Sequence, residues 1–221
     1  MIPPPTPAAL VLASRSPQRR AILEQLGVDF TVRVSDAEEL VGGDDPCAVA
    51  VSNAVRKAQA VWRAGPVAAR GDSAGGAAES SSTAPPARSA LPVLGVDTVV
   101  VLDGVLYGKP ADAAEARATL EGLSGRTHEV VSGVAVVEAG EVRTAHATTR
   151  VSFRELDAST LDWYLATEEW RERAGGYAIQ GRGAALVAGI EGDYLNVVGL
   201  PVTTLLELLP DLLQAGAQPS V

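Results

Sequence analysis

Cysteine is almost absent from this 221-residue chain, in which Cys47 is the only one. A single cysteine excludes an intramolecular disulfide and fits a reducing compartment. Aromatic residues make up only 4% of the sequence, and no apolar run approaches the roughly 20 residues that a membrane-spanning helix needs. The first residues, MIPPPTPAAL, carry no basic segment before their short apolar run, so we expect no signal peptide. These features predict a cytoplasmic protein that has no membrane partner.

Positive charge is also scarce, because 18 Lys and Arg residues stand against 27 Asp and Glu residues, which gives a net charge of -9. A general nucleic-acid-binding protein is usually basic, so nucleic acid is not an expected partner. An acidic protein can still bind a polyanion if it concentrates its cations locally or recruits a metal. Candidate sites are therefore to be sought where the few basic residues gather.

Helical and strand-like patterns alternate along the chain and predict an α/β fold with a mixed sheet. The expected strands are residues 9–13, 30–34, 94–102, 105–107, 128–137 and 142–154, and the expected helices are residues 17–26, 46–64, 112–123, 157–167 and 201–213. In the second helix, Val51, Val55, Ala58 and Trp62 share one apolar side. Short strands and turns are expected in residues 175–198.

One segment differs in composition from the rest of the chain. Residues 65–90 are rich in Gly, Ser, Ala and Pro and lack large apolar side chains. Such a composition is typical of a mobile surface loop. A tolerated insertion is favoured over a functional lid. Residues 1–221 are therefore interpreted as one domain with a disordered, low-complexity insertion at 65–90.

The first candidate site follows the first strand, where Ser14 and Ser16 precede a helix that begins at Pro17. The first N–H groups of a helix are unpaired and its dipole is positive there, so this turn can bind an anion. Arg19 and Arg20 lie in the first turns, and the fork of an arginine matches phosphate oxygens. The alternative is a surface helix that Ser16 caps and whose arginines are solvated.

Asp97 is a single acid inside an otherwise apolar strand. A buried carboxylate is costly unless a cation or a metal accompanies it. Asp97 could ligate a divalent ion, take a proton from an attacking water, or serve only as a structural acid. Lys109 follows a hairpin turn at Asp103-Gly104 and could neutralise a phosphate.

A pair of acids, Glu38 and Glu39, follows the second strand, and Lys57 lies on the next helix. Carboxylates in such a turn can hold a hard cation through their oxygens. A solvated acidic turn and an ordinary surface lysine are the alternatives.

A glycine-rich stretch, GGYAIQGRG, spans residues 175–183. Its glycines would let the backbone approach a ligand closely, and Gln180 could read a base edge with both its donor and its acceptor. The dinucleotide fingerprint is absent, because the third glycine of that pattern is missing. The alternative is a simple bend between strands.

Together and in this order, these segments resemble the Maf family of nucleoside triphosphate pyrophosphatases. The matching stretches are LASRSPQRRAILEQLGVDF, NAVRKA, LGVDTVVVLDGVLYGKP, LSGRTHEVVSGVAV, GGYAIQGRGAALV and IEGDYLNVVGLP. They cover nearly the whole chain except residues 65–90 and the two tails. The resemblance implies an α/β fold with an elongated mixed sheet, flanking helices and two lobes around a cleft, similar to inosine triphosphatase-type enzymes. It also implies hydrolysis that depends on a divalent cation, Mg²⁺ or Mn²⁺.

The resemblance assigns expected roles to residues of this chain. It implies phosphate binding by Ser14, Arg19, Lys57 and Lys109, catalysis by Asp97, metal binding by Glu39 and Asp97, and substrate selection by Gln18, Thr98 and Gln180. The stretches Asp97-Thr98 and Ile179-Gln180-Gly181 resemble the subfamily that acts on dTTP and UTP. Gln18 departs from that pattern, because the compared members carry Arg there.

The function that the resemblance implies is hydrolysis of dTTP and UTP, with modified pyrimidine triphosphates included, to the monophosphate and pyrophosphate. This is a housecleaning role in nucleotide metabolism. The alternatives are a 7-methyl-GTP pyrophosphatase and a nucleotide-binding regulator of septum formation. The expected partner is a nucleoside triphosphate, and a homodimer is an open expectation.

Overall fold

The computed structural model describes residues 10–40, 42–43, 45–65 and 91–214. The expected insertion at 65–90 therefore lies outside the described residues, apart from Gly65. The strands are β1 (Leu10–Leu12), β2 (Phe30–Val32), β3 (Val93–Leu102), β4 (Val105–Tyr107), β5 (Thr127–Glu138), β6 (Glu141–Phe153) and β7 (Val187–Glu191). The helices are α1 (Pro17–Gln25), α2 (Pro46–Arg63), α3 (Ala113–Leu123), α4 (Ala158–Leu165), α5 (Tyr194–Val198) and α6 (Val202–Leu208), with 3₁₀ turns η1 (Ala174–Gly176) and η2 (Arg182–Leu186). Among the described helices, none is long and apolar enough to cross a membrane.

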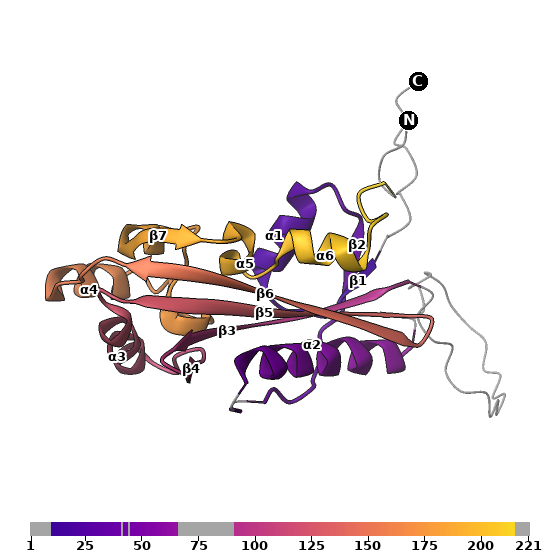
Figure 1. Cartoon of the computed structure of the whole chain (residues 1–221), viewed down its shortest axis with the longest axis horizontal. Coiled ribbons are helices and arrows are strands. Elements are labelled where there is room, and N and C mark those ends of the chain that lie inside the picture. The colour runs from indigo at the N-terminus through magenta and orange to yellow at the C-terminus, as the bar shows by residue number, and fades with distance from the viewer. Residues whose placement is uncertain (1–9, 41, 44, 66–90, 215–221) are drawn as a thin grey trace, which may run out of the picture.

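The strands form one seven-stranded mixed sheet in the order β2-β1-β3-β5-β6-β7, with β4 paired to β3. β1 runs parallel to β2 and β3, and the remaining pairs are antiparallel. The long strands β3, β5 and β6 give the molecule an elongated shape, with α2 on one face of the sheet and α1, α5 and α6 on the other (Figure 1). The prediction of an α/β fold with an elongated mixed sheet is confirmed.

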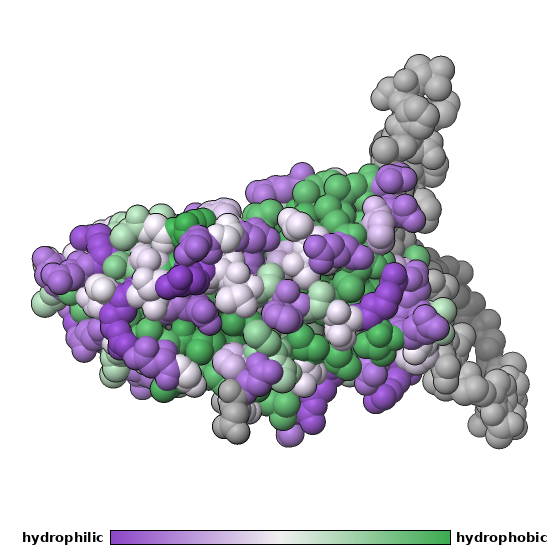
Figure 2. Space-filling view, viewed as in Figure 1, coloured by the Kyte–Doolittle hydropathy of each residue, from purple (hydrophilic) through white to green (hydrophobic). Residues whose placement is uncertain are grey.

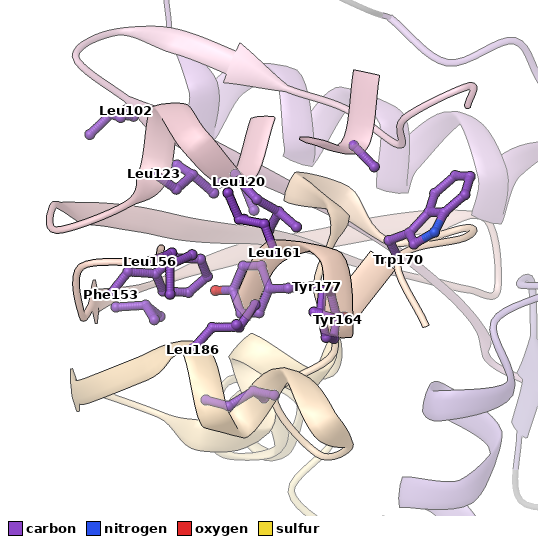
Figure 3. Packing of buried hydrophobic residues seen from close by; sticks show 14 of the residues in the cluster. Leu102, Leu120, Leu123, Phe153, Leu156, Leu161, Tyr164, Trp170, Tyr177 and Leu186 are labelled. Atoms are coloured by element: carbon purple, nitrogen blue, oxygen red, sulfur yellow. The ribbon is translucent and has the colours of Figure 1, made fainter. Parts of the chain in front are cut away.

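Two hydrophobic clusters occupy opposite ends of this sheet. One contains leucines of α3 and α4 together with the rings of Phe153, Tyr164 and Tyr177 (Figure 3). The other joins β1, α1 and α6, and partly buried leucines leave the surface over α6 largely apolar (Figure 2). The chain therefore has two lobes that share the central strands, as the resemblance implied.

The free edge of β3 opens between these lobes. β1 pairs with Val93 and Leu94, whereas β4 pairs on the same side with residues 100–102. Residues 95–99 lie between these two partners, and Asp97 is at the centre of the interval. A strand that changes partner in this way leaves a gap in the sheet, and Asp97 lies at this gap.

Helix α2 lies unusually close to the sheet because two strand glycines face it. A Cβ added at Gly95 would lie 2.9 Å from the backbone nitrogen of Ala58, and one at Gly133 would clash with the backbone of Ala50. The expected apolar side was partly wrong, because Val51 and Val55 are only half-buried. Opposite the two glycines the helix instead presents Ala50, Ala54 and Ala58, since only small side chains fit at this separation.

Several local signals are confirmed, and some boundaries differ. Asp103 and Gly104 both have positive φ (52° and 78°), as a tight hairpin turn requires. The second strand ends at Val32 instead of residue 34. The last helix ends at Leu208 instead of residue 213, because Pro210 disfavours the helical conformation in Leu209.

The segment 175–198 contains more helix than the sequence indicated. Besides β7, it includes two 3₁₀ turns and the short helix α5, which Asp193 caps by accepting a hydrogen bond from the Leu195 N–H. Ser16 stands at the N-cap of α1 but makes no capping hydrogen bond, because its hydroxyl donates to Gln18 Oε1 instead.

Candidate active site

A cleft of about 1050 Å³ opens at the gap beside β3. Its size is that of a typical small-molecule site. The structure brings to its wall nine residues that the sequence suggested for the site, namely Ser14, Gln18, Arg19, Glu39, Lys57, Asp97, Thr98, Lys109 and Gln180. Two other candidates, Arg20 and Glu38, are exposed and do not line it. They come from the start of α1, the loop after β2, α2, β3, the segment after β4 and the segment after η1.

Asp97 is buried at 6% exposure, and both of its carboxylate oxygens have a partner. Oδ1 lies 2.6 Å from Lys57 Nζ, and Oδ2 accepts a hydrogen bond of 2.9 Å from Asn53 Nδ2. Asn53 and Lys57 are one turn apart on α2, so they share the face that contacts β3. The close approach of α2 at Gly95 and Gly133 thus delivers both donors to the acid.

Lys57 lies between two acids, because its Nζ is 2.6 Å from Glu39 Oε1 as well as from Asp97 Oδ1. Burial alone would raise the pKa of Glu39, but the hydrogen bond and charge of Lys57 outweigh it, with help from Lys109 and Arg19, and hold the pKa below its usual value. Glu39 is therefore ionised at neutral pH. Two carboxylates flanking one cation form a strongly polar centre in the cleft.

This centre has the donors that a divalent cation prefers. In the part of the chain that the structure describes, no cluster of three or more His, Cys, Asp or Glu could hold a metal ion without help. Mg²⁺ usually binds through one or two carboxylates and completes its shell with waters and substrate phosphates. The pair Glu39 and Asp97 fits that kind of site.

Arg19 approaches β3 from the opposite face of the sheet. Its side chain is 8% exposed, and it donates to the Gly199 carbonyl at 2.9 Å, Ser14 Oγ at 3.0 Å and Thr98 Oγ1 at 3.1 Å. Burial lowers the pKa of Arg19, while the charges of Asp97 and Glu39 raise it. Thr98 follows Asp97 in the strand and therefore points to the other face, where its hydroxyl also meets Ser132 Oγ at 2.8 Å.

The far rim of the cleft is more exposed. Lys109 pairs with Glu172 at 3.2 Å, and both side chains are largely accessible to solvent. Gln180 is exposed too and lines the same cleft from within the glycine-rich stretch. A Cβ at Gly175 would lie 2.8 Å from Val100 Cγ2, and Gly183 packs against the backbone of Ala178. These two glycines thus serve packing of the chain on itself. The stretch is not a bend between two strands, because it lies between α4 and β7 and contains 3₁₀ turns.

Comparison with known proteins identifies the family of this chain. The model of the Maf-like protein family matches residues 9–212. The chain belongs to the Maf family. It is 46% identical to a dTTP/UTP pyrophosphatase of Moorella thermoacetica, over 90% of this chain and 93% of the relative. It is 43% identical to a dTTP/UTP pyrophosphatase of Symbiobacterium thermophilum, over 90% and 92% of the two chains. A dTTP/UTP pyrophosphatase of Pyrococcus furiosus is 38% identical over 90% and 93%.

Asn53 is the residue of this Maf chain that the sequence reasoning missed. It lies at 2% exposure on α2 and contacts Asp97 directly. The signal that could have found it was its spacing, since a polar residue four positions before Lys57 lies on the same helical face. A buried asparagine on a face of alanines would have pointed to the same partner.

Proposed function

We propose that this Maf protein is a nucleoside triphosphate pyrophosphatase that hydrolyses dTTP and UTP to the monophosphate and pyrophosphate. The observation that carries the proposal is the centre of Asp97, Lys57 and Glu39 in a cleft that also presents Arg19 and the helix start of α1. Relatives that match nine-tenths of this chain bear the name dTTP/UTP pyrophosphatase, which supports the same substrates here.

In the proposed reaction, water adds across the bond between the α- and β-phosphates, and pyrophosphate departs. Asp97 orients the water and accepts its proton. Arg19, Lys57 and Lys109 offset the negative charge on the phosphate chain, and Ser14 supplies a hydroxyl beside Arg19. Positioned charges of this kind contribute the largest part of such catalysis, because phosphoryl transfer needs little covalent help from the protein.

Glu39 and Asp97 would hold a divalent cation, Mg²⁺ or Mn²⁺, once the phosphates replace the carboxylates as partners of Lys57. A bound cation would neutralise phosphate charge and bring the phosphate chain to the centre of the cleft. The proposed cation thus shares the two acids that Lys57 contacts at 2.6 Å in the protein alone.

Gln180, Gln18 and Thr98 are proposed to select the base. Gln180 carries a donor and an acceptor at the rim, which can pair with the polar edge of a pyrimidine. Gln18 lies on the first turn of α1, where its Oε1 accepts a hydrogen bond of 3.1 Å from Ser16 Oγ. Thr98 acts through Arg19, to which its hydroxyl is bound. A cytoplasmic location and a homodimer remain predictions.

Incubation with UTP and Mg²⁺ or Mn²⁺ tests the proposal directly. The expected products are UMP and pyrophosphate, and release of UDP and orthophosphate would refute the cleavage position. Asp97→Asn should lower kcat by about two orders of magnitude or more, as loss of a general base does. Faster turnover of 7-methyl-GTP than of UTP would overturn the base assignment. Nucleotide binding without turnover of any triphosphate would favour the regulatory alternative.

A further inference from the structure

Asn53 forms hydrogen bonds to two parts of the cleft that are distant in the sequence, the loop after β2 and the strand β3. Its Oδ1 accepts a hydrogen bond of 2.7 Å from the Leu40 N–H, and its Nδ2 donates to the Leu40 carbonyl at 3.1 Å. The same Nδ2 donates to Asp97 Oδ2 at 2.9 Å. The buried amide is thus fully engaged between the loop after β2 and the strand β3.

We propose that Asn53 is a positioning residue that fixes the acid Asp97 relative to the loop carrying Glu39. The inference rests on the proposed function, because it concerns the same reaction. Glu39 directly precedes Leu40, so the two hydrogen bonds to the Leu40 backbone fix the backbone from which the Glu39 side chain extends into the cleft. The third hydrogen bond ties this loop to the acid itself.

The two oxygens of the Asp97 carboxylate have different partners, and this supports the role of Asn53. Lys57 contacts Oδ1, and Asn53 contacts Oδ2, so the carboxylate plane is held from both sides and cannot rotate freely. Lys57 must exchange partners when phosphates arrive, whereas Asn53 is neutral and buried and can keep its contact throughout the reaction.

The loop has one further attachment nearby. Arg56 Nη1 donates to the Glu38 carbonyl at 2.9 Å, so α2 holds the backbone on both sides of Glu39. Arg56 is exposed and does not contact Asp97. Lys57 joins only the side chain of Glu39 to Asp97. Among the hydrogen bonds of the described residues, Asn53 alone ties the backbone of this loop to the acid, so its loss frees that backbone from Asp97.

Two substitutions separate the two contacts. Asn53→Ala removes every hydrogen bond of the amide. Asn53→Asp keeps an oxygen that accepts from the Leu40 N–H, but it replaces the donor to Asp97 with a second carboxylate. Val61→Ala is the matched control, because Val61 is buried at 3% exposure on the same helix and lies outside the cleft lining. It should lower the melting temperature without changing the site.

The test combines amide hydrogen exchange with kinetics on UTP. By NMR of the nucleotide-free protein, the Leu40 amide should be protected in the parent and in Asn53→Asp, and should exchange at least about tenfold faster in Asn53→Ala. Both variants should lose about 10- to 100-fold in kcat and need more Mg²⁺ for half-maximal activity, with a smaller change in KM, as removal of a supporting hydrogen bond does.

The outcomes that overturn the inference are distinct from those that overturn the function. Unchanged kcat in both variants, or a loss that Val61→Ala reproduces at equal melting temperature, would show that Asn53 is only structural. An unprotected Leu40 amide in the parent would show that the loop is not anchored. If the parent fails to hydrolyse UTP while Leu40 still loses protection in Asn53→Ala, the proposed substrate falls and the anchoring role stands.

Discussion

Replacing Gly133 by alanine is expected to displace helix α2 and thereby disturb the contacts of Asp97 in the active site. Gly133 lies directly opposite Asp97 in the pairing of β3 with β5. A Cβ there would lie well inside 3.0 Å of the backbone of Ala50 and Val51, whereas ordinary contacts begin at 3.4 Å. Helix α2 would have to retreat by about 1 Å to restore normal contact.

The same retreat would stretch the contacts of Asp97. The distance from Lys57 Nζ to Asp97 Oδ1 is 2.6 Å, and adding about 1 Å exceeds the range of a good hydrogen bond. Misplacement of about 1 Å can cost about 100-fold in rate. Overpacking of this kind also costs about 1–3 kcal/mol of folding free energy, or about 2–4 °C in melting temperature for each kcal/mol in a chain of this size.

Thermal unfolding and kcat/KM for UTP measure the two effects. Gly189→Ala is the control, because Gly189 lies in β7 of the same sheet, its added Cβ would meet nothing within 4 Å, and its φ is not positive. The control should match the parent in both assays. A Gly133→Ala protein that melts at the parent's temperature and keeps full activity would show that the position of α2 does not depend on this glycine.

Two further predictions follow from the buried charges. Lys57→Met should bind Mn²⁺ more tightly than the parent in the absence of nucleotide, because no ammonium group then competes with the cation for Glu39 and Asp97. If calorimetry finds equal affinity, the cation binds elsewhere. Burial lowers the pKa of His128 from 6.5 to about 4, so the unfolded chain takes up a proton first as the pH falls from 6.5 to 4. Stability should therefore decrease across this window by up to about 3 kcal/mol, and urea unfolding should show a smaller decrease in His128→Asn.

Features that depend on neighbouring residues could be predicted from the sequence. The hairpin at Asp103-Gly104 follows from residues that tolerate positive φ. The helix after Asp112 follows from its cap, where the carboxylate accepts from the Glu115 N–H. Asp97 was informative for a similar reason, because an acid inside an apolar strand demands a partner wherever the chain folds.

Features that depend on distant packing could not be predicted. Periodicity placed Val51 and Val55 on the apolar side of α2, yet the glycines of β3 and β5 select alanines for the contact. No pattern along the chain reveals that two strand glycines lie under one helix. The spacing of Asn53 before Lys57 could have placed it on the face of α2 that contacts β3, but not its contact with Leu40, which is 13 positions away in the sequence.

The charges of the cleft explain how an acidic protein can receive a triphosphate. Lys57 is neutralised by Asp97 and Glu39, and Lys109 by Glu172. Arg19 differs, because its three hydrogen bonds go to uncharged oxygens and the described residues give it no ion pair. Among the cations proposed to bind phosphate, Arg19 therefore keeps a charge that no acid of the described residues pairs with, while each lysine becomes available only when phosphate or a cation competes for its acids. Attraction at Arg19 in a chain of net charge -9 acts over about 8–10 Å at physiological salt, so substrate capture should weaken as ionic strength rises.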